Sequence, residues 1–240
     1  MSSFNLRLES PRQMTWTFFV CICNIKGMET KVYILDLKEF ENKERFDELY
    51  ALMPEYRREK IDRIKSEADK IRSLGAGVLL HNLCKEFGME GADNNILIGE
   101  NGKPSFREYR DIHFSLSHSG ERAMLVASDR ECGCDVEKIK PINMNIAKRS
   151  FDSTEYEYIM EAISEEEKAE RFFRLWTMKE SVMKVTGQGF KLFPNTFSID
   201  LSKEKPILSS GNGLDKIELF DMIKNDGYVY AYGIETVPVP

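Results

Sequence analysis

The order in which strand and helix patterns follow one another is the feature that most constrains the fold. A strand pattern at 31–36 is followed by helical patterns, the longest at 68–87, and then by two strands at 112–117 and 124–128 joined through a Ser-Gly turn. The second half of the chain repeats this order. The sequence therefore predicts an α+β fold of two similar α/β halves related by a pseudo-twofold axis, with the active site in the cleft between them.

Further elements complete the two halves. The remaining predicted segments are helices at 43–53 and 55–64, short strands at 96–99 and 103–106, a strand at 133–139, helices that start at Thr154 and Glu165, and strands at 198–200, 216–220 and 228–232. Ser164 and Glu167 have capping-box spacing, and Gly187 is placed to end the long helix. Gly133 permits another group to approach the strand that it opens.

These patterns divide the chain into three segments. Residues 1–28 read as an appended segment, because the first strand of the fold opens at Lys31. The N-terminal half then covers 29–130 and the C-terminal half covers 131–240. The sequence shows neither a linker nor a low-complexity segment between the halves, so we expect them to pack as one body.

Charge and cysteine content narrow the class of protein. The 240 residues carry a net charge of −6, which argues against a general nucleic-acid-binding protein. Five cysteines, an odd number, without a secretory signal predict reduced thiols and a cytoplasmic location. Cys132 and Cys134 fit one face of a strand better than a zinc site, whose usual spacing is wider. The apolar run at 16–23 is too short to cross a bilayer, so we expect no membrane partner.

Carboxylates gather at two places in the second half. Asp135 and Glu137 alternate with apolar residues, so both leave the strand on the same side, where a divalent cation would relieve their repulsion. A solvated strand edge is the alternative. Glu180 adds a third carboxylate from the edge of an apolar helix stripe, and Lys184 lies one turn further. An ordinary surface Glu–Lys pair, which contributes about 0.2–0.5 kcal/mol, is the alternative there.

Seven basic residues crowd into a short span of the first half. They are Arg57, Arg58, Lys60, Arg63, Lys65, Lys70 and Arg72. This cluster is compatible with phosphate binding and equally with a solvated helix face.

Two motifs resemble a known family. GCDVEKI (133–139) and RLWTMKESVMK (174–184) resemble the paired motifs of the 4′-phosphopantetheinyl transferases, of the larger single-chain, surfactin-synthetase-activating type. The resemblance also includes 54–73, 102–104, 115–119 and 151–155, and covers the chain from about residue 31 to the end.

The resemblance implies roles for the acidic and basic groups of the second half. Asp135, Glu137 and Glu180 would hold Mg²⁺, which bridges to the pyrophosphate of coenzyme A, and Asp135 would thereby belong to the coenzyme A site. Glu180 would also deprotonate the acceptor serine, while Lys184 would contact phosphate and stabilise the leaving 3′,5′-ADP. Lys179 lies in the apolar stripe, and we expect its side chain to extend out of the core.

The resemblance places coenzyme A binding mainly in the first half. Arg57 and Lys60 would bind the 3′-phosphate, and Arg72 and Ser73 would lie near the nucleotide. The other matching positions are Lys103 of a G-K-P motif and Ser117 and His118 of an S-H pair beside phosphate. Residues 29–130 would thus bind the nucleotide, and 131–240 would carry magnesium and the catalytic groups.

The implied activity is the magnesium-dependent transfer of 4′-phosphopantetheine from coenzyme A to a serine of an apo acyl or peptidyl carrier protein, by a monomer. The alternatives are a non-catalytic relative that binds coenzyme A or a carrier, and a magnesium-dependent nuclease, which the acidic net charge disfavours. The segment 141–158 offers a wall for the carrier through Ile142, Met144, Ile146, Lys148, Arg149 and Phe151. Its apolar side chains are equally suited to covering the core.

Overall fold

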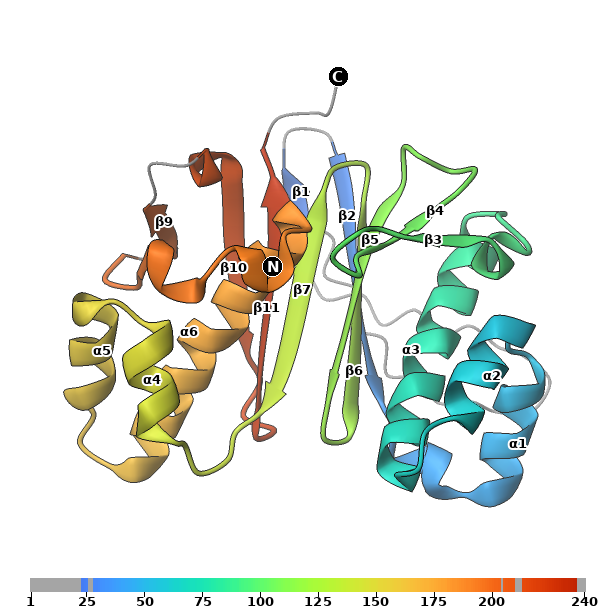
Figure 1. Ribbon diagram of the computed structural model, residues 1–240, viewed down its shortest axis with the longest axis horizontal. Coiled ribbons are helices and arrows are strands. Elements are labelled where there is room, and N and C mark those ends of the chain that lie inside the picture. Colours follow the sequence, from blue (N-terminus) through green and yellow to red (C-terminus); the bar gives the residue numbers. More distant parts are fainter. Residues whose placement is uncertain (1–22, 26–27, 204, 210–212, 237–240) are drawn as a thin grey trace. The chain divides into compact units, whose positions relative to one another are not determined.

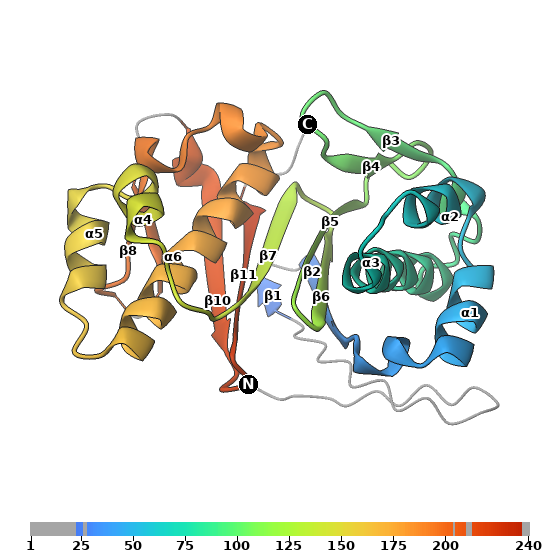
Figure 2. The ribbon, with the colours of Figure 1, turned by 60° about the horizontal axis from the view of Figure 1, so that its bottom comes forward.

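The computed structural model describes residues 23–25, 28–203, 205–209 and 213–236 (Figures 1 and 2). It has mixed helices and antiparallel sheets, which confirms the α+β class. The chain divides into two compact units. The first unit comprises Met1–Leu97 and Pro104–Asp129, and the second comprises Ile98–Lys103 and Arg130–Pro240. Most of the predicted appendage, residues 1–22 and 26–27, lies outside the described residues.

The first unit is a sheet covered by helices (Figure 1). Its four-stranded antiparallel sheet has the order β1-β2-β6-β5. The elements are β1 (Cys23–Ile25), β2 (Met28–Asp36), a 3₁₀ turn (Lys38–Glu41), α1 (Lys43–Ala51), α2 (Glu55–Asp62), α3 (Glu67–Glu86), a 3₁₀ turn (Ala92–Asn94), β5 (His113–Ser119) and β6 (Arg122–Ser128). Two short strands, β3 (Ile96–Ile98) and β4 (Pro104–Phe106), pair with each other.

Helix α3 forms and packs for reasons that can be read from its residues. Ser66 caps its first turn by accepting a hydrogen bond from the backbone N–H of Asp69. Ten of its residues are buried, including Leu74, Leu79 and Leu83, which join the core of the first unit. Gly77 lets Arg57 lie against the helix, because a Cβ there would come within 3.3 Å of the Arg57 side chain.

The second unit repeats the combination of antiparallel strands and covering helices (Figure 2). Its three-stranded sheet has the order β10-β11-β7, and β8 pairs with β9. The elements are β7 (Cys132–Lys138), α4 (Met144–Ser150), α5 (Ser153–Met160), α6 (Glu165–Thr186), 3₁₀ turns (Gly189–Lys191, Pro194–Thr196 and Leu214–Lys216), β8 (Ser198–Asp200), β9 (Ile207–Ser209), β10 (Ile217–Ile223) and β11 (Tyr228–Glu235). Both cysteines of β7 are buried.

The ends of α6 lie where the sequence predicts them. Ser164 accepts a hydrogen bond from the backbone N–H of Glu167, and Gly187 ends the helix with φ +64°. The carboxylate of Glu167, however, accepts from the backbone of Ile163 rather than from that of Ser164. The full capping box belongs to α5 instead.

Helix α6 lies directly on β7 at Gly133. A Cβ at this position would come within 2.3 Å of the carbonyl oxygen of Ser181 and 2.4 Å of the backbone nitrogen of Val185. The prediction that Gly133 permits a close approach is thereby confirmed. The close contact brings the helix backbone onto the strand that carries Asp135.

The prediction for the side chain of Lys179 is wrong. Its side chain does not extend out of the core but is fully buried, and its ammonium donates to the carbonyl oxygens of Pro194 (2.7 Å) and Phe197 (2.6 Å). Glu155 adds an ion pair at 2.8 Å, and its other carboxylate oxygen accepts from the backbone N–H of Ile199. Burial lowers the pKa of Lys179 and raises that of Glu155, each more than the opposing charge restores it. These partners compensate the cost of burying the charge of Lys179. They come from outside α6, so the apolar stripe of the helix does not indicate them.

The segment 141–158 contains a helix, α4, that the sequence patterns missed. Phe151 is buried and Ile142 and Met144 pack against the core of the second unit, so these apolar side chains do cover the core. Lys148 and Arg149, in the last turn of α4, are exposed. No helix among the described residues is long and apolar enough to span a membrane.

Candidate active site

Strand β7 holds the first two acidic side chains of the site. Asp135 and Glu137 lie two residues apart and therefore leave the strand on the same side. Asp135 is buried and Glu137 is half-buried. Their strand pairs with β11, where Asp135 lies opposite Ala231 and Glu137 opposite Val229.

Helix α6 brings Glu180 to these carboxylates. The pKa of Glu180 is raised to about 7, mainly by burial and then by the charge of Asp135; Lys184 opposes the rise, and Glu137 adds to it. The other two carboxylates of the predicted set thus both act on Glu180 within the second unit. A carboxyl group with a pKa near neutrality is suited to accept and release a proton at physiological pH.

Lys184 pairs with one of the carboxylates of the site. Its ammonium donates a 2.7 Å hydrogen bond to Oδ1 of Asp135 and forms an ion pair with it. Burial has the largest single effect and lowers the pKa of Lys184, but the charge and hydrogen bond of Asp135, with the charges of Cys134 and Glu180, together outweigh it, so the pKa is raised. Lys184 therefore remains a cation while it neutralises part of the acidic cluster.

The residues of this cluster fit Mg²⁺ by their chemistry. They offer carboxylate oxygens, the ligands that this cation prefers. The pKa of Glu180 is raised by burial and also by the charges of Asp135 and Glu137, a repulsion that a cation would relieve. Within the described part of the chain, however, no group of three or more His, Cys, Asp or Glu side chains is arranged to hold a metal ion. A metal would have to draw Asp135 and Glu137 together with Glu180, in competition with Lys184.

A basic group occupies the first unit. Arg57 is buried and Lys60, one turn further along α2, has its pKa lowered by burial and by the charge of Arg57. Nε of Arg57 and Oγ of Ser73 are both buried and have no hydrogen-bond partner among the described residues. Such groups call for an explanation, and a bound ligand is one.

Arg72 and His118 belong to a second part of the same unit. Arg72 pairs with Asp69 and donates to the carbonyl oxygen of Gly120, which follows β5. The pKa of Asp69 is lowered, chiefly by Arg72 and to a small extent by His118. His118 is exposed on β5, whereas its neighbour Ser117 is buried. The structure thus brings Arg72 and His118 near one carboxylate.

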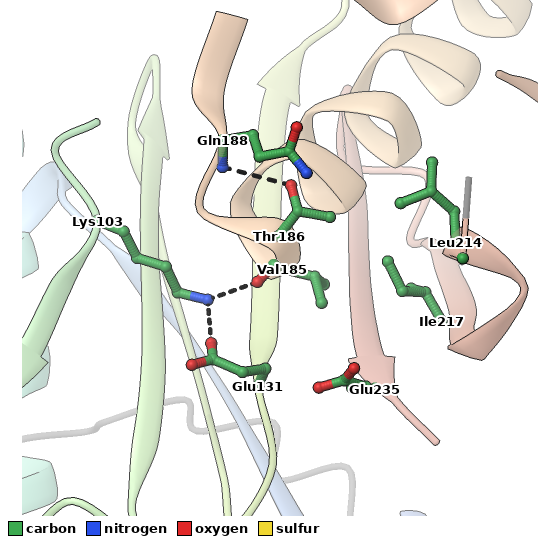
Figure 3. A pocket seen from close by; sticks show the side chains of 9 residues that line it. Lys103, Glu131, Val185, Thr186, Gln188, Leu214, Ile217 and Glu235 are labelled. Carbon is green, nitrogen blue, oxygen red and sulfur yellow. Dashed lines mark hydrogen bonds and ion pairs between the residues drawn. The ribbon is translucent and has the colours of Figure 1, made fainter. Parts of the chain in front are cut away.

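Lys103 lines a pocket of about 330 Å³ in the second unit (Figure 3). Its ammonium donates to the carboxylate of Glu131 and, at 2.8 Å, to the carbonyl oxygen of Val185. Glu131 was missed by the sequence analysis. It lies 28 residues from Lys103, so no local pattern links the two.

Comparison with known proteins identifies the family. Residues 131–232 match the model of the 4′-phosphopantetheinyl transferase superfamily. The 4′-phosphopantetheinyl transferase Sfp of Bacillus subtilis (strain 168) is 35% identical over 165 residues, which cover 68% of this chain and 72% of that protein. The chain belongs to the 4′-phosphopantetheinyl transferases. The transferase psf-1 of Bacillus pumilus is 33% identical over 178 residues, 72% of this chain and 76% of that protein.

The match to the transferase superfamily coincides with the acidic site. It spans β7 and α6, and so includes Asp135, Glu137, Glu180 and Lys184. The basic group of the first unit lies outside the matched range 131–232.

Proposed function

We propose that this transferase moves 4′-phosphopantetheine from coenzyme A to a serine of an apo acyl or peptidyl carrier protein and releases 3′,5′-ADP. The observation that carries the proposal is Glu180, a carboxyl group with its pKa raised to about 7, beside Asp135 and Lys184 in the part that matches the superfamily. The monomeric state, the cytoplasmic location and the pseudo-twofold relation of the two halves stay predictions.

The acidic site supplies the groups that this reaction needs. The serine oxygen forms a bond to the phosphorus that carries the pantetheine, and the bridging bond to the 5′-phosphate of the leaving 3′,5′-ADP breaks. Glu180 accepts the serine proton, for which a pKa of about 7 is well matched. Lys184 neutralises the charge that develops on the leaving phosphate.

Mg²⁺ is part of this proposal. Asp135, Glu137 and Glu180 would hold the cation, which would neutralise the pyrophosphate of coenzyme A. Asp135, if neutralised by this cation, would no longer need Lys184 as its partner, and the ammonium of Lys184 would then be available to phosphate. The 2.7 Å bond between Lys184 and Asp135 supports this exchange, because it shows that one carboxylate already binds a cation.

We further propose that the first unit binds the nucleotide part of coenzyme A. Arg57 and Lys60 would take the 3′-phosphate, and the lowered pKa of Lys60 beside Arg57 supports this, since an anion would relieve the repulsion of the two cations. The partnerless Nε of Arg57 and Oγ of Ser73 would gain acceptors or donors from the ligand. Arg72, Ser117 and His118 complete the proposed set.

The exposed end of α4 is the proposed contact for the carrier. Lys148 and Arg149 are exposed there, and Ile146 is 43% exposed. Carrier proteins are expected to be acidic, and this chain has a net charge of −6, so a local basic patch must supply the attraction.

Incubation of the protein with an apo carrier, coenzyme A and Mg²⁺, followed by mass measurement of the carrier, tests the function. We expect the carrier to gain one phosphopantetheine group, and no gain with Glu180→Gln. Binding of coenzyme A without any mass gain would instead establish the non-catalytic alternative.

A further inference from the structure

Lys103 joins two elements that carry the acidic site. Its ammonium donates to the carbonyl oxygen of Val185, in the last turn of α6, and to the carboxylate of Glu131, directly before β7 (Figure 3). Helix α6 carries Glu180 and Lys184, and β7 carries Asp135 and Glu137. One side chain thus spans the ends of both elements.

The same segment binds the end of α6 a second time. Nδ2 of Asn101 donates to the carbonyl oxygen of Gly187 at 3.0 Å. Gly187 has φ +64°, and a Cβ there would come within 3.3 Å of Cδ of Lys103, so the lysine stem passes close to the helix end. The last carbonyl groups of a helix have no partner within it, and a cation near them is favoured by the helix dipole. Lys103 and Asn101 supply these partners from outside the helix.

The position of α6 along β7 depends on such anchors. At Gly133 the backbones of α6 and β7 meet without an intervening side chain. Gly133 therefore has no side chain that could interlock with α6 and stop the helix from sliding along the strand. A small shift of the helix along the strand would move Glu180 and Lys184 relative to Asp135. Contacts at the helix end resist that shift.

Lys103 is poorly suited to bind phosphate in this arrangement. Two of its three ammonium hydrogens are committed to Glu131 and Val185, and Glu131 neutralises its charge. A phosphate group would find only one ammonium hydrogen uncommitted, on a lysine whose charge Glu131 already balances.

We propose that Lys103 is a positioning residue: with Glu131 it clamps the end of α6 to the start of β7 and so keeps Glu180 and Lys184 opposite Asp135. This inference rests on the proposed transferase function for its effect on turnover. It assigns to Lys103 a role other than direct contact with coenzyme A.

The test compares Lys103→Met with Glu131→Gln, which removes the other half of the pair. Because a displacement of about 1 Å in a site can cost about 100-fold in rate, we expect both variants to lower kcat for carrier modification at least about tenfold. The Kd for coenzyme A, measured by calorimetry, should stay within about twofold of the unaltered protein, since neither residue touches the ligand in this proposal. Lys103→Arg should restore part of kcat.

Amide hydrogen exchange gives a measurement that does not depend on activity. We expect faster exchange at residues 184–187 in Lys103→Met and in Glu131→Gln. Lys191→Met, which removes an exposed lysine of the same unit, is the matched control and should leave both exchange and turnover unchanged.

Two results would overturn the clamp. One is a Lys103→Met variant with weakened coenzyme A binding and unchanged kcat, together with a Glu131→Gln variant that binds coenzyme A as well as or better than the unaltered protein. The other is unchanged exchange at 184–187 in both variants. If the unaltered protein fails to modify any carrier, the transferase proposal falls, while the exchange experiment still decides the clamp.

Discussion

Oδ1 of Asp135 accepts a 2.7 Å hydrogen bond from the ammonium of Lys184, and this pair ties the acidic strand to the helix that lies across it. Asp135 is therefore neutralised by a side chain of the same unit before any ligand binds. The pair predicts what loss of either group does.

Asp135→Asn keeps the shape of the side chain but removes its charge. We expect transfer to fall by at least about 100-fold, because both the cation site and the partner of Lys184 are weakened. Turnover at saturating Mg²⁺ and coenzyme A measures this, and circular dichroism checks that the fold is retained. Near-normal turnover at ordinary Mg²⁺ concentration would show that Asp135 is not a metal ligand.

The stability of the metal-free protein should depend on the ionisation of Glu180. Its pKa is raised from 4.5 to about 7 by burial and by Asp135, so the folded state binds the proton more tightly than the unfolded state does. The contribution of protonated Glu180 to the free energy of unfolding is therefore complete below pH 4.5, and it is lost as the pH rises through about 7.

Urea unfolding in the presence of a chelator, at several pH values between 5 and 8, measures this dependence. Glu180→Gln should remove the part of the slope of unfolding free energy against pH that comes from Glu180, since the amide does not titrate. Identical slopes for the two proteins would contradict the raised pKa of Glu180.

The proposed 3′-phosphate site predicts a difference between two donors. Arg57→Ala combined with Lys60→Ala should raise KM strongly for coenzyme A and much less for 3′-dephospho-coenzyme A, which lacks the group that the two cations would bind. Steady-state kinetics with both donors measure the difference. Equal increases would mean that these residues do not bind the 3′-phosphate.

The basic end of α4 predicts an effect on the carrier alone. Charge reversal through Lys148→Glu with Arg149→Glu should raise KM for the carrier severalfold and leave coenzyme A affinity unchanged, because both residues are exposed and remote in sequence from the nucleotide set. Reversal at Lys191 and Lys203, two exposed lysines of the second unit, is a control for the change in net charge. Unchanged carrier kinetics would exclude this patch as a contact.

The buried pair of Lys179 and Glu155 should be important for stability. Lys179→Met leaves a buried carboxylate and two carbonyl oxygens without their donor, and we expect unfolding to become easier by about 3–5 kcal/mol. Chemical denaturation measures the loss. A loss below about 1 kcal/mol would mean that the site accommodates the missing charge.

Local patterns predicted the parts of the site that are local in sequence. The alternation around Asp135 and the turn between Glu180 and Lys184 each place two groups on one side of a regular element, and the structure has both. The start and the end of α6 at Ser164 and Gly187 were likewise readable, because capping depends on neighbouring residues.

Contacts between distant segments were not predictable in the same way. The partners of Lys179 come from residues 155, 194 and 197, and the partner of Lys103 comes from residue 131. Nothing near either lysine indicates that it is paired. A short helix such as α4 was missed because its seven residues carry too few apolar positions to show a period.

The main-chain contact at Gly133 has a consequence for how the sequence around the site can change. Where two elements are held apart by side chains, each exchange of a core residue alters their separation. Here the distance between α6 and β7 is set by backbone atoms at Gly133, so exchanges elsewhere in the core can accumulate while the separation of the helix from the strand is preserved. Many core positions can thus change their side chains because Gly133, where a Cβ would collide with the backbone of α6, cannot.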